Sequence, residues 1–294
     1  MRQVALKAFA KVNLGLQVLG RRPDGFHEIR SVLQSVSLHD RLEIRLEGQG
    51  IGLEIDDPAL PSGPENLVFR AAARLLAGIP DPPGIALRLY KKIPVGAGLG
   101  GGSSDAAAVL VGIDRLLDLR LDPAALIEHA AALGSDVPYF LTGGAALVTG
   151  RGTEVTPLPD PPSRELLIVH PGSLLSTREV YAQIEEPLTL ARKPASIPGF
   201  ERIPVDIASW VRSGNDLEPH AERLCPAIGV IRSFVERAGA EVAAMTGSGS
   251  AVFGIFADAE ARDRAADEAE RSGFRTFRCH TLDRAAYLGD RWFP

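Results

Sequence analysis

Pro94-Val-Gly-Ala-Gly-Leu-Gly-Gly-Gly-Ser-Ser104 carries the strongest structural signal in this chain. Five of its eleven residues are glycine, which tolerates positive φ and leaves the backbone open to a ligand. An alternating apolar pattern precedes it at 85–93 and a helical apolar pattern follows it at 106–117, so the segment connects a strand to a helix. Backbone N–H groups there act together with the positive end of the helix dipole, and phosphate is the ligand they favour.

Two better-known glycine motifs fit this turn poorly. A Walker A loop needs a Lys-Ser/Thr pair after its last glycine, and Gly102 is followed by two serines. The dinucleotide fingerprint G-x-G-x-x-G matches at Gly96, Gly98 and Gly101, but it requires a strand after the helix. A second helix is predicted there, from Asp122-Pro123. A glycine-rich connection without a ligand stays an alternative, although it would cost backbone entropy with no packing gain.

The chain length and pattern predict two α+β domains. At about 150 residues per domain, 294 residues suggest two units. A proline-rich, weakly patterned stretch at 151–164 marks the boundary, which gives domains at 1–157 and 158–294. Strands and helices occur in both halves without strict alternation, which is typical of α+β sheets.

Composition excludes several classes of partner. The formal net charge is −5 and no Lys/Arg cluster dominates one element, so a nucleic-acid partner is not expected. No run approaches the ~18 apolar residues of a membrane span, and Met1–Ala10 does not read as a signal peptide. Cys225 and Cys279 form neither a disulfide framework nor a metal pattern. We therefore expect a cytoplasmic protein without a membrane partner.

The first segment predicts a strand with one buried face. Apolar residues occupy the even positions from Val4 to Val18, so Lys11 and Asn13 share the face turned away from the core. Later strands are predicted at 31–38, 41–46, 85–93, 165–170, 241–245, 251–256 and 274–280. Helices are predicted from Leu67, after the glycine turn with Ser103 or Ser104 as cap, at 123–133, after Ser176, at 219–238 and at 259–272.

Three polar groups are candidates for phosphoryl transfer, which needs charge neutralisation and a group that accepts the hydroxyl proton. Lys11 lies beside Asn13, Asp136 lies in Gly134-Ser-Asp-Val-Pro138 just past a helix end, and His27 follows a polar turn. Each residue also has an alternative without a role in catalysis. Lys11 could be a solvated lysine on a strand, Asp136 an ordinary acidic residue of a loop, and His27 a structural histidine.

These segments together resemble a known group of enzymes. The glycine turn is similar to the ATP-binding motif of the GHMP kinase superfamily. Ala10–Leu14, Arg22–His27, Gly134–Pro138, Asn215–Pro219 and Thr246–Gly249 resemble one family within it, the 4-diphosphocytidyl-2-C-methyl-D-erythritol kinases. The resemblance implies a two-domain fold, with an N-terminal domain like ribosomal protein S5 domain 2 and a ferredoxin-like C-terminal domain.

The same resemblance implies an activity and a set of residues. The activity is ATP-dependent phosphorylation of the 2-hydroxyl of the cytidyl substrate, in the non-mevalonate route to isoprenoid precursors. Asp136 would be the base, Lys11 its charged neighbour, and Gly247 part of a turn that closes the site. ATP would bind Asn66, Pro94, Val95, Gly96, Ala97, Gly98, Leu99, Gly100, Gly101, Gly102, Ser103 and Ser104, and the substrate would bind Asn13, Phe26, His27, Asp136 and Gly247.

Some features depart from the family pattern or stay open. Phe26 replaces a common tyrosine, which keeps a ring for stacking but removes the phenol oxygen. Ala97 replaces a common glycine, so its φ must be negative. Mg²⁺ is implied by ATP chemistry, with Ser104 and Asp105 as candidate ligands. Another GHMP kinase, such as a homoserine kinase, and a non-catalytic nucleotide-binding regulator stay alternatives, as do monomer and homodimer.

Overall fold

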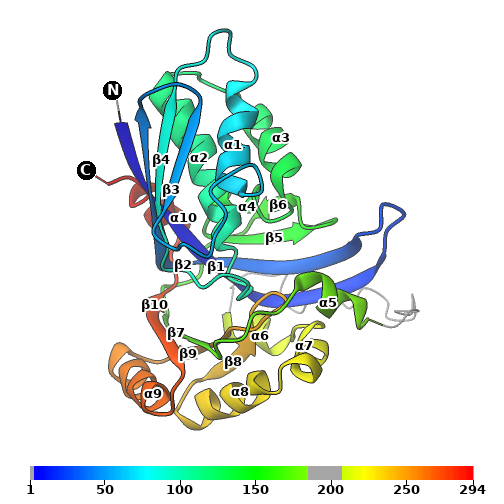
Figure 1. The fold of residues 1–294 in the computed structure, drawn as a ribbon. Coiled ribbons are helices and arrows are strands. Elements are labelled where there is room, and N and C mark those ends of the chain that lie inside the picture. The colour runs from blue at the N-terminus through cyan, green and yellow to red at the C-terminus, as the bar shows by residue number, and fades with distance from the viewer. Residues whose placement is uncertain (1–2, 185–206, 294) are drawn as a thin grey trace.

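The computed structural model describes residues 3–184 and 207–293, which form two β-sheets, each covered by helices (Figure 1). The predicted α+β class is confirmed, because strands and helices are mixed around both sheets. The predicted boundary between residues 157 and 158 stays a prediction. It falls between the last strand of the first sheet and the first strand of the second.

The first sheet has six strands in the order β3-β4-β2-β5-β6, with β1 paired to β2. A helical layer lies on one face of this sheet, where α1 and α2 pack side by side (Figure 1). The strands are β1 (Gln3–Arg21), β2 (His27–Leu46), β3 (Ile51–Ile55), β4 (Ile85–Tyr90), β5 (Ala145–Thr149) and β6 (Glu154–Pro157). The helices are α1 (Leu67–Leu76), α2 (Gly101–Leu117), α3 (Pro123–Leu133) and α4 (Tyr139–Thr142).

The second sheet has four antiparallel strands in the order β10-β7-β9-β8. Numbered within the sheet, this is the order 4-1-3-2 of a ferredoxin-like fold, with α8 and α9 below it (Figure 1). The strands are β7 (Glu165–His170), β8 (Val242–Met245), β9 (Val252–Phe256) and β10 (Arg275–His280). The helices of this part of the chain are α5 (Thr177–Ala182), α6 (Ile207–Arg212), α7 (Glu218–Leu224), α8 (Ala227–Arg237) and α9 (Ala259–Arg271). After β10 the chain returns to the first sheet with α10 (Arg284–Gly289), where the Tyr287 hydroxyl donates to the Phe140 carbonyl (Figure 1).

The prediction that β1 has one buried face is wrong in its middle part. Phe9, Lys11 and Asn13 are at most 5% exposed, although they alternate with the apolar positions. A register shift against β2 between Phe9 and Lys11 exchanges the two sides of the strand, so Val12 and Leu14 pack with Trp210 of the second domain. Lys11 then lies on the side of the glycine turn and Asp136, where it is buried against them. Lys11 and Asn13 do share one side, as predicted, because the Lys11 ammonium donates to the Asn13 amide oxygen.

The glycine turn adopts the conformation that its sequence requires. Gly96, Gly98 and Gly100 have φ values of 64°, 76° and 72°. Ala97 lies between two of them without a positive φ, as its Cβ demands. The prediction that Ser103 or Ser104 caps α2 is wrong, because the helix already begins at Gly101 with Gly100 as its left-handed N-cap. The Ser104 hydroxyl instead donates to the Phe9 carbonyl.

The predicted helix over 219–238 is two helices. α7 ends at Leu224 and α8 begins at Ala227. Pro226 lies between them and has no N–H to continue the first helix, which explains the break. Among the described residues, no helix is long and apolar enough to cross a membrane.

A buried ion cluster supports the strand that leads into the glycine turn. The Lys91 ammonium contacts both Asp40 and Asp105, and Asp40 also accepts the backbone N–H groups of Lys92 and Ile93. Asp40 and Asp105 are at most 1% exposed. Burial raises the pKa of the Asp105 carboxyl to about 8, with Lys91 opposing the rise and Asp40 adding to it.

The raised pKa of Asp105 predicts that stability falls with rising pH. Between an unfolded pKa of about 3.9 and the folded value, the native state holds a proton that the unfolded chain has lost. This contribution is complete below the unfolded pKa and is lost as pH rises through about 8. Between pH 6 and pH 9, we expect the free energy of unfolding of the wild type, measured in urea, to fall by on the order of 1–3 kcal/mol more than that of Asp105→Asn. Asp118→Asn, which changes an exposed carboxyl, is the control. If the free energy of unfolding changed with pH in the same way in the wild type and in Asp105→Asn, the raised pKa of Asp105 would be contradicted.

The two domains interlock at Gly98, and this contact predicts different effects for two glycines. A Cβ on Gly98 would lie 2.0 Å from the Thr246 carbonyl oxygen, at a φ of +76°, whereas a Cβ on Gly102 would meet only Leu67 at 3.9 Å. We expect Gly98→Ala to lower the free energy of unfolding by about 2 kcal/mol or more. Gly102→Ala should leave it unchanged or slightly higher. Equal free energies of unfolding for Gly98→Ala and Gly102→Ala in urea would contradict a close contact between Gly98 and the Thr246 carbonyl.

Candidate active site

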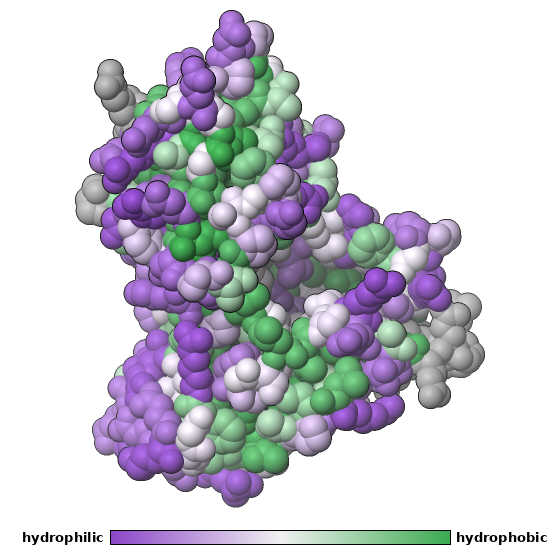
Figure 2. Space-filling view, in the orientation of Figure 1, coloured by the Kyte–Doolittle hydropathy of each residue, from purple (hydrophilic) through white to green (hydrophobic). Residues whose placement is uncertain are grey.

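A cavity of about 1350 Å³ opens between the two domains. The molecule is hollowed there in the space-filling view (Figure 2). The glycine turn, the middle of β1, the β1–β2 hairpin, the loop after α3, the start of α5 and the β8–β9 turn all line it. Residues far apart in the sequence therefore meet around one space.

The structure brings nearly all of the predicted site residues together in this cavity. Those that line it are Lys11, Asn13, Phe26, His27, Asn66, Pro94, Val95, Gly96, Ala97, Gly98, Leu99, Gly100, Gly101, Gly102, Ser103, Asp136 and Gly247. Ser104 does not, because its side chain is buried beneath the turn, bonded to Phe9. Their roles stay predictions, and only their common location is an observation.

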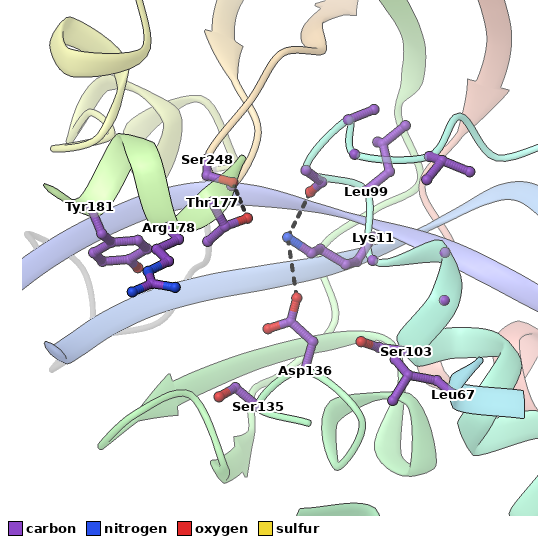
Figure 3. A pocket seen from close by; sticks show the side chains of 18 of the residues that line it. Lys11, Leu67, Leu99, Ser103, Ser135, Asp136, Thr177, Arg178, Tyr181 and Ser248 are labelled. Carbon is purple, nitrogen blue, oxygen red and sulfur yellow. Dashed lines mark hydrogen bonds and ion pairs between the residues drawn. The ribbon is translucent and has the colours of Figure 1, made fainter. Parts of the chain in front are cut away.

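Lys11 and Asp136 face each other at the centre of the cavity (Figure 3). The Lys11 Nζ atom lies 3.8 Å from the Asp136 carboxylate, 2.8 Å from the Gly98 carbonyl oxygen and 2.5 Å from the Asn13 amide oxygen. The Lys11 side chain is only 4% exposed, whereas that of Asp136 is 37% exposed. Lys11 is therefore fixed by Asn13 and Gly98, whereas the carboxylate of Asp136 is accessible to a ligand.

Burial lowers the pKa of the Lys11 ammonium, and the charge of Asp136 opposes this shift. An ammonium held by two neutral oxygens and one carboxylate is a fixed positive charge at the mouth of the glycine turn. Such a group can stabilise negative charge that develops on a transferring phosphoryl group. An exposed carboxylate beside it can accept a proton from a hydroxyl.

The second domain reaches this centre through the β8–β9 turn. Thr246 accepts the backbone N–H of Asn13 with its Oγ1 atom at 3.0 Å and donates to the Gly98 carbonyl. Asn215 donates from its amide to the carbonyl oxygens of Met245 and Gly247, which fixes the turn from below. The turn that closes the site is therefore connected directly to β1 and to the glycine turn.

Aromatic groups gather at the other end of the cavity. The His27 ring stacks on the Tyr181 ring with centroids 4.9 Å apart. Phe26 is 49% exposed, and the Arg151 guanidinium lies 5.2 Å from the centre of its ring. A planar heterocycle would find stacking surfaces and a hydrogen-bonding ring there.

The glycine turn offers N–H donors to an anion. Across residues 3–184 and 207–293, the N–H groups of Gly101 and Gly102 find no protein acceptor, as expected at a helix start. The empty space above Gly102 leaves room for a ligand. Asn66 lines the same region, but its side chain caps α1 by accepting the Val68 N–H and donating to the Pro61 carbonyl.

The two candidate Mg²⁺ ligands do not fit that role well. The Ser104 hydroxyl is bonded to a backbone carbonyl, and Asp105 is paired with Lys91. No group of three or more His, Cys, Asp or Glu side chains that could hold a metal occurs in the described part of the chain. A cation that entered with a nucleotide would be bound mainly by phosphate oxygens and water.

Sequence reasoning did not identify several residues of the cavity. Thr177, Arg178 and Tyr181 lie on the short helix α5, and Ser248 contacts Thr177 through their hydroxyls at 2.8 Å. The Ser176-x-x-Glu179 pattern correctly predicts that helix, and Ser176 caps it. Spacing in so short a helix gives no sign of which face lines a ligand site.

Two family models match the chain. The model of the N-terminal domain of GHMP kinases matches residues 66–144, and the model of their C-terminal domain matches residues 205–275. The chain is 42% identical to 4-diphosphocytidyl-2-C-methyl-D-erythritol kinase of Moorella thermoacetica, over 95% of this chain and 99% of that protein. It is 44% identical to the enzyme of the same name from Pelotomaculum thermopropionicum, over 90% and 93%.

Solved structures give the same picture. A crystal structure of 4-(cytidine 5'-diphospho)-2C-methyl-D-erythritol kinase has a TM-score of 0.76 and 35% identity, covering 94% of this chain and 98% of that one. A homoserine kinase from Cytophaga hutchinsonii has a TM-score of 0.74 at 23% identity and covers 96% and 95%, which shows a shared fold. From these relatives, the chain belongs to the 4-diphosphocytidyl-2-C-methyl-D-erythritol kinase family of the GHMP kinases.

Proposed function

We propose that this protein transfers the γ-phosphoryl group of ATP to the 2-hydroxyl of 4-diphosphocytidyl-2-C-methyl-D-erythritol, in the non-mevalonate route to isoprenoid precursors. The observation that carries the proposal is the Lys11–Asp136 pair, 3.8 Å apart, at the point where the glycine turn and the cavity meet. Relatives with this enzyme name match nearly the whole chain.

Asp136 is the group that handles the acceptor hydroxyl. Its Oδ atoms accept the hydroxyl proton as the oxygen attacks, and its partial exposure gives the hydroxyl access. Lys11 keeps its place through Asn13 and Gly98, so it needs no rearrangement when charge develops. The Asn13 side chain is buried and hydrogen-bonded to Ser31 and Lys11, with the residue 5% exposed. Its role in the proposal is to hold Lys11 in place and to contact the methylerythritol unit of the substrate.

The glycine turn binds the triphosphate. Positive φ at Gly96, Gly98 and Gly100 turns the backbone around an open space, and the first N–H groups of α2 point to an anion at the helix start. A helix terminus alone contributes about 0.3–2 kcal/mol, so the whole turn, Lys11 and a cation must act together. Mg²⁺ supplies that cation and neutralises phosphate charge when it is bound.

The aromatic end of the cavity binds the cytosine. Phe26 offers an exposed ring face, and His27 can hydrogen-bond the edge of a base. Tyr181 lies against His27 and would form the second side of this subsite. The proposal also takes the protein as a cytoplasmic monomer or homodimer that acts on small molecules.

The most direct test is a coupled ADP-release assay with a panel of acceptors. With the cytidyl substrate, homoserine, mevalonate and galactose, we expect turnover only of the first. Turnover of homoserine alone would replace the proposed function by that of another GHMP kinase. ATP binding without turnover of any acceptor would favour a nucleotide-binding regulator.

Asp136→Asn tests the proposed base. The amide keeps the shape of the side chain but cannot accept the proton, so kcat should fall about 10²- to 10⁴-fold. Calorimetric titration should still show ATP binding with a similar Kd. Ser135→Ala removes a neighbouring hydroxyl that also lines the cavity, and it serves as the matched control. Full turnover by Asp136→Asn would exclude the carboxylate as the base.

Phe26 and His27 variants test the cytosine subsite. Loss of a stacking ring costs about 1–3 kcal/mol per base, so Phe26→Ala should raise KM for the cytidyl substrate about 10- to 100-fold. His27→Ala should act in the same direction, and KM for ATP should hardly change in either variant. Phe26→Tyr retains the ring and is the control. An equal rise of both KM values would indicate a folding defect rather than a base-binding site.

A further inference from the structure

The charges around the cavity limit how two anionic ligands can bind. Five cations line it, which are Lys11, Arg21, Lys91, Arg151 and Arg178, together with four carboxylates, which are Asp24, Glu65, Asp105 and Asp136. The proposed reaction brings a triphosphate and a diphosphate into this space. The cations that are not already engaged therefore decide where the phosphates are held.

Four of the five cations already have partners. Lys11 is held by Asn13, Gly98 and Asp136, and Lys91 lies between two buried aspartates. Arg151 donates to the Ala131 carbonyl and packs on the Phe26 ring, and Arg21 is also engaged. None of these side chains is available without giving up a contact.

Arg178 differs from these four. It is exposed on α5, and its guanidinium has no acceptor and no ring partner within residues 3–184 and 207–293. Its side chain nevertheless lies along the cavity rather than away from it (Figure 3). α5 itself is fixed to the second domain, because the Thr177 hydroxyl is hydrogen-bonded to that of Ser248.

Arg178 lies between the sites proposed for the nucleobase and for the reacting hydroxyl of the acceptor. Arg178 and Tyr181 are three residues apart and so share one face of α5. In the view of Figure 3 the guanidinium is seen between the Tyr181 ring and Asp136, and Ser103 is seen on the far side of Asp136. Tyr181 marks the nucleobase end through its stacking on His27, and Asp136 marks the reacting hydroxyl.

We propose that Arg178 binds the diphosphate group of the acceptor substrate. This inference rests on the proposed function, because it needs a ligand with its base at Tyr181 and its hydroxyl at Asp136. The diphosphate joins these two parts, so it passes the guanidinium. The planar fork of donors on arginine matches phosphate oxygens, and Arg178 has no competing acceptor to release first.

Inhibition by two cytosine compounds tests the assignment directly. Cytidine and CDP differ only in the diphosphate, and both are measured as competitors of the cytidyl substrate at saturating ATP. The wild type should bind CDP more tightly than cytidine. In Arg178→Ala, the ratio of the two inhibition constants should shrink about 10-fold, with little change for cytidine itself. Arg178→Lys should recover part of the ratio, because it keeps the charge but not the fork.

A matched control and two other outcomes complete the test. Arg70→Ala removes an exposed arginine on α1 that does not line the cavity, and it should leave both inhibition constants and turnover unchanged. If the ratio of the inhibition constants for cytidine and CDP is unchanged in Arg178→Ala, the assignment is overturned. This also holds if the KM for ATP rises in that variant, because Arg178 would then bind the triphosphate of ATP and not the diphosphate of the acceptor. A wild type that neither turns over the cytidyl substrate nor binds cytidine overturns the proposed function, and the Arg178 assignment with it.

Discussion

The buried ammonium of Lys11 is the constraint on which the site depends. A charge that is 3% exposed must be compensated, because an unpaired buried charge costs several kcal/mol. The compensation comes from three parts of the chain, through the Asn13 amide, the Gly98 carbonyl and the Asp136 carboxylate. Thr246 then bonds to both Asn13 and Gly98 and adds the second domain. Any arrangement that satisfies Lys11 therefore also assembles the glycine turn, the carboxylate and the closing turn around one point.

This constraint explains why β1 breaks the simple rule for a surface strand. The alternation of apolar residues correctly predicts the strand, but it predicts a solvated face for Lys11 and Asn13. Both faces are buried in the middle, because Val12 and Leu14 pack against the second domain while Lys11 and Asn13 are covered by the glycine turn, Asp136 and Thr246. Period-two alternation reports which residues face a strand's own core, and it contains no information about a second domain that arrives from about two hundred residues later in the chain.

The same distinction separates what could be predicted at the site from what could not. Local backbone rules correctly gave a negative φ at Ala97 and a ligand-sized opening at the glycine turn. The resemblance placed Lys11, Asp136, Phe26 and His27 in one cavity, and the structure has them there. The prediction that Ser103 or Ser104 caps α2 is wrong, because the helix begins at Gly101, before either serine. Arg178 and Tyr181 were missed because they depend on how a six-residue helix is placed against another domain.

An acidic protein can bind two phosphate-rich ligands because its local charges are arranged before the ligands arrive. The chain carries a formal charge of −5, so its overall field does not attract anions. Within the cavity, however, five cationic side chains lie with four acidic ones, and burial raises the pKa of one of the four, Asp105, to about 8. Most of the cations are held by neighbours. Fixed charges and fixed N–H groups need no reorganisation as negative charge develops, whereas a mobile surface lysine would. Arg178, which has no partner within residues 3–184 and 207–293, is the cation in this cavity that can turn to a ligand without giving up a contact.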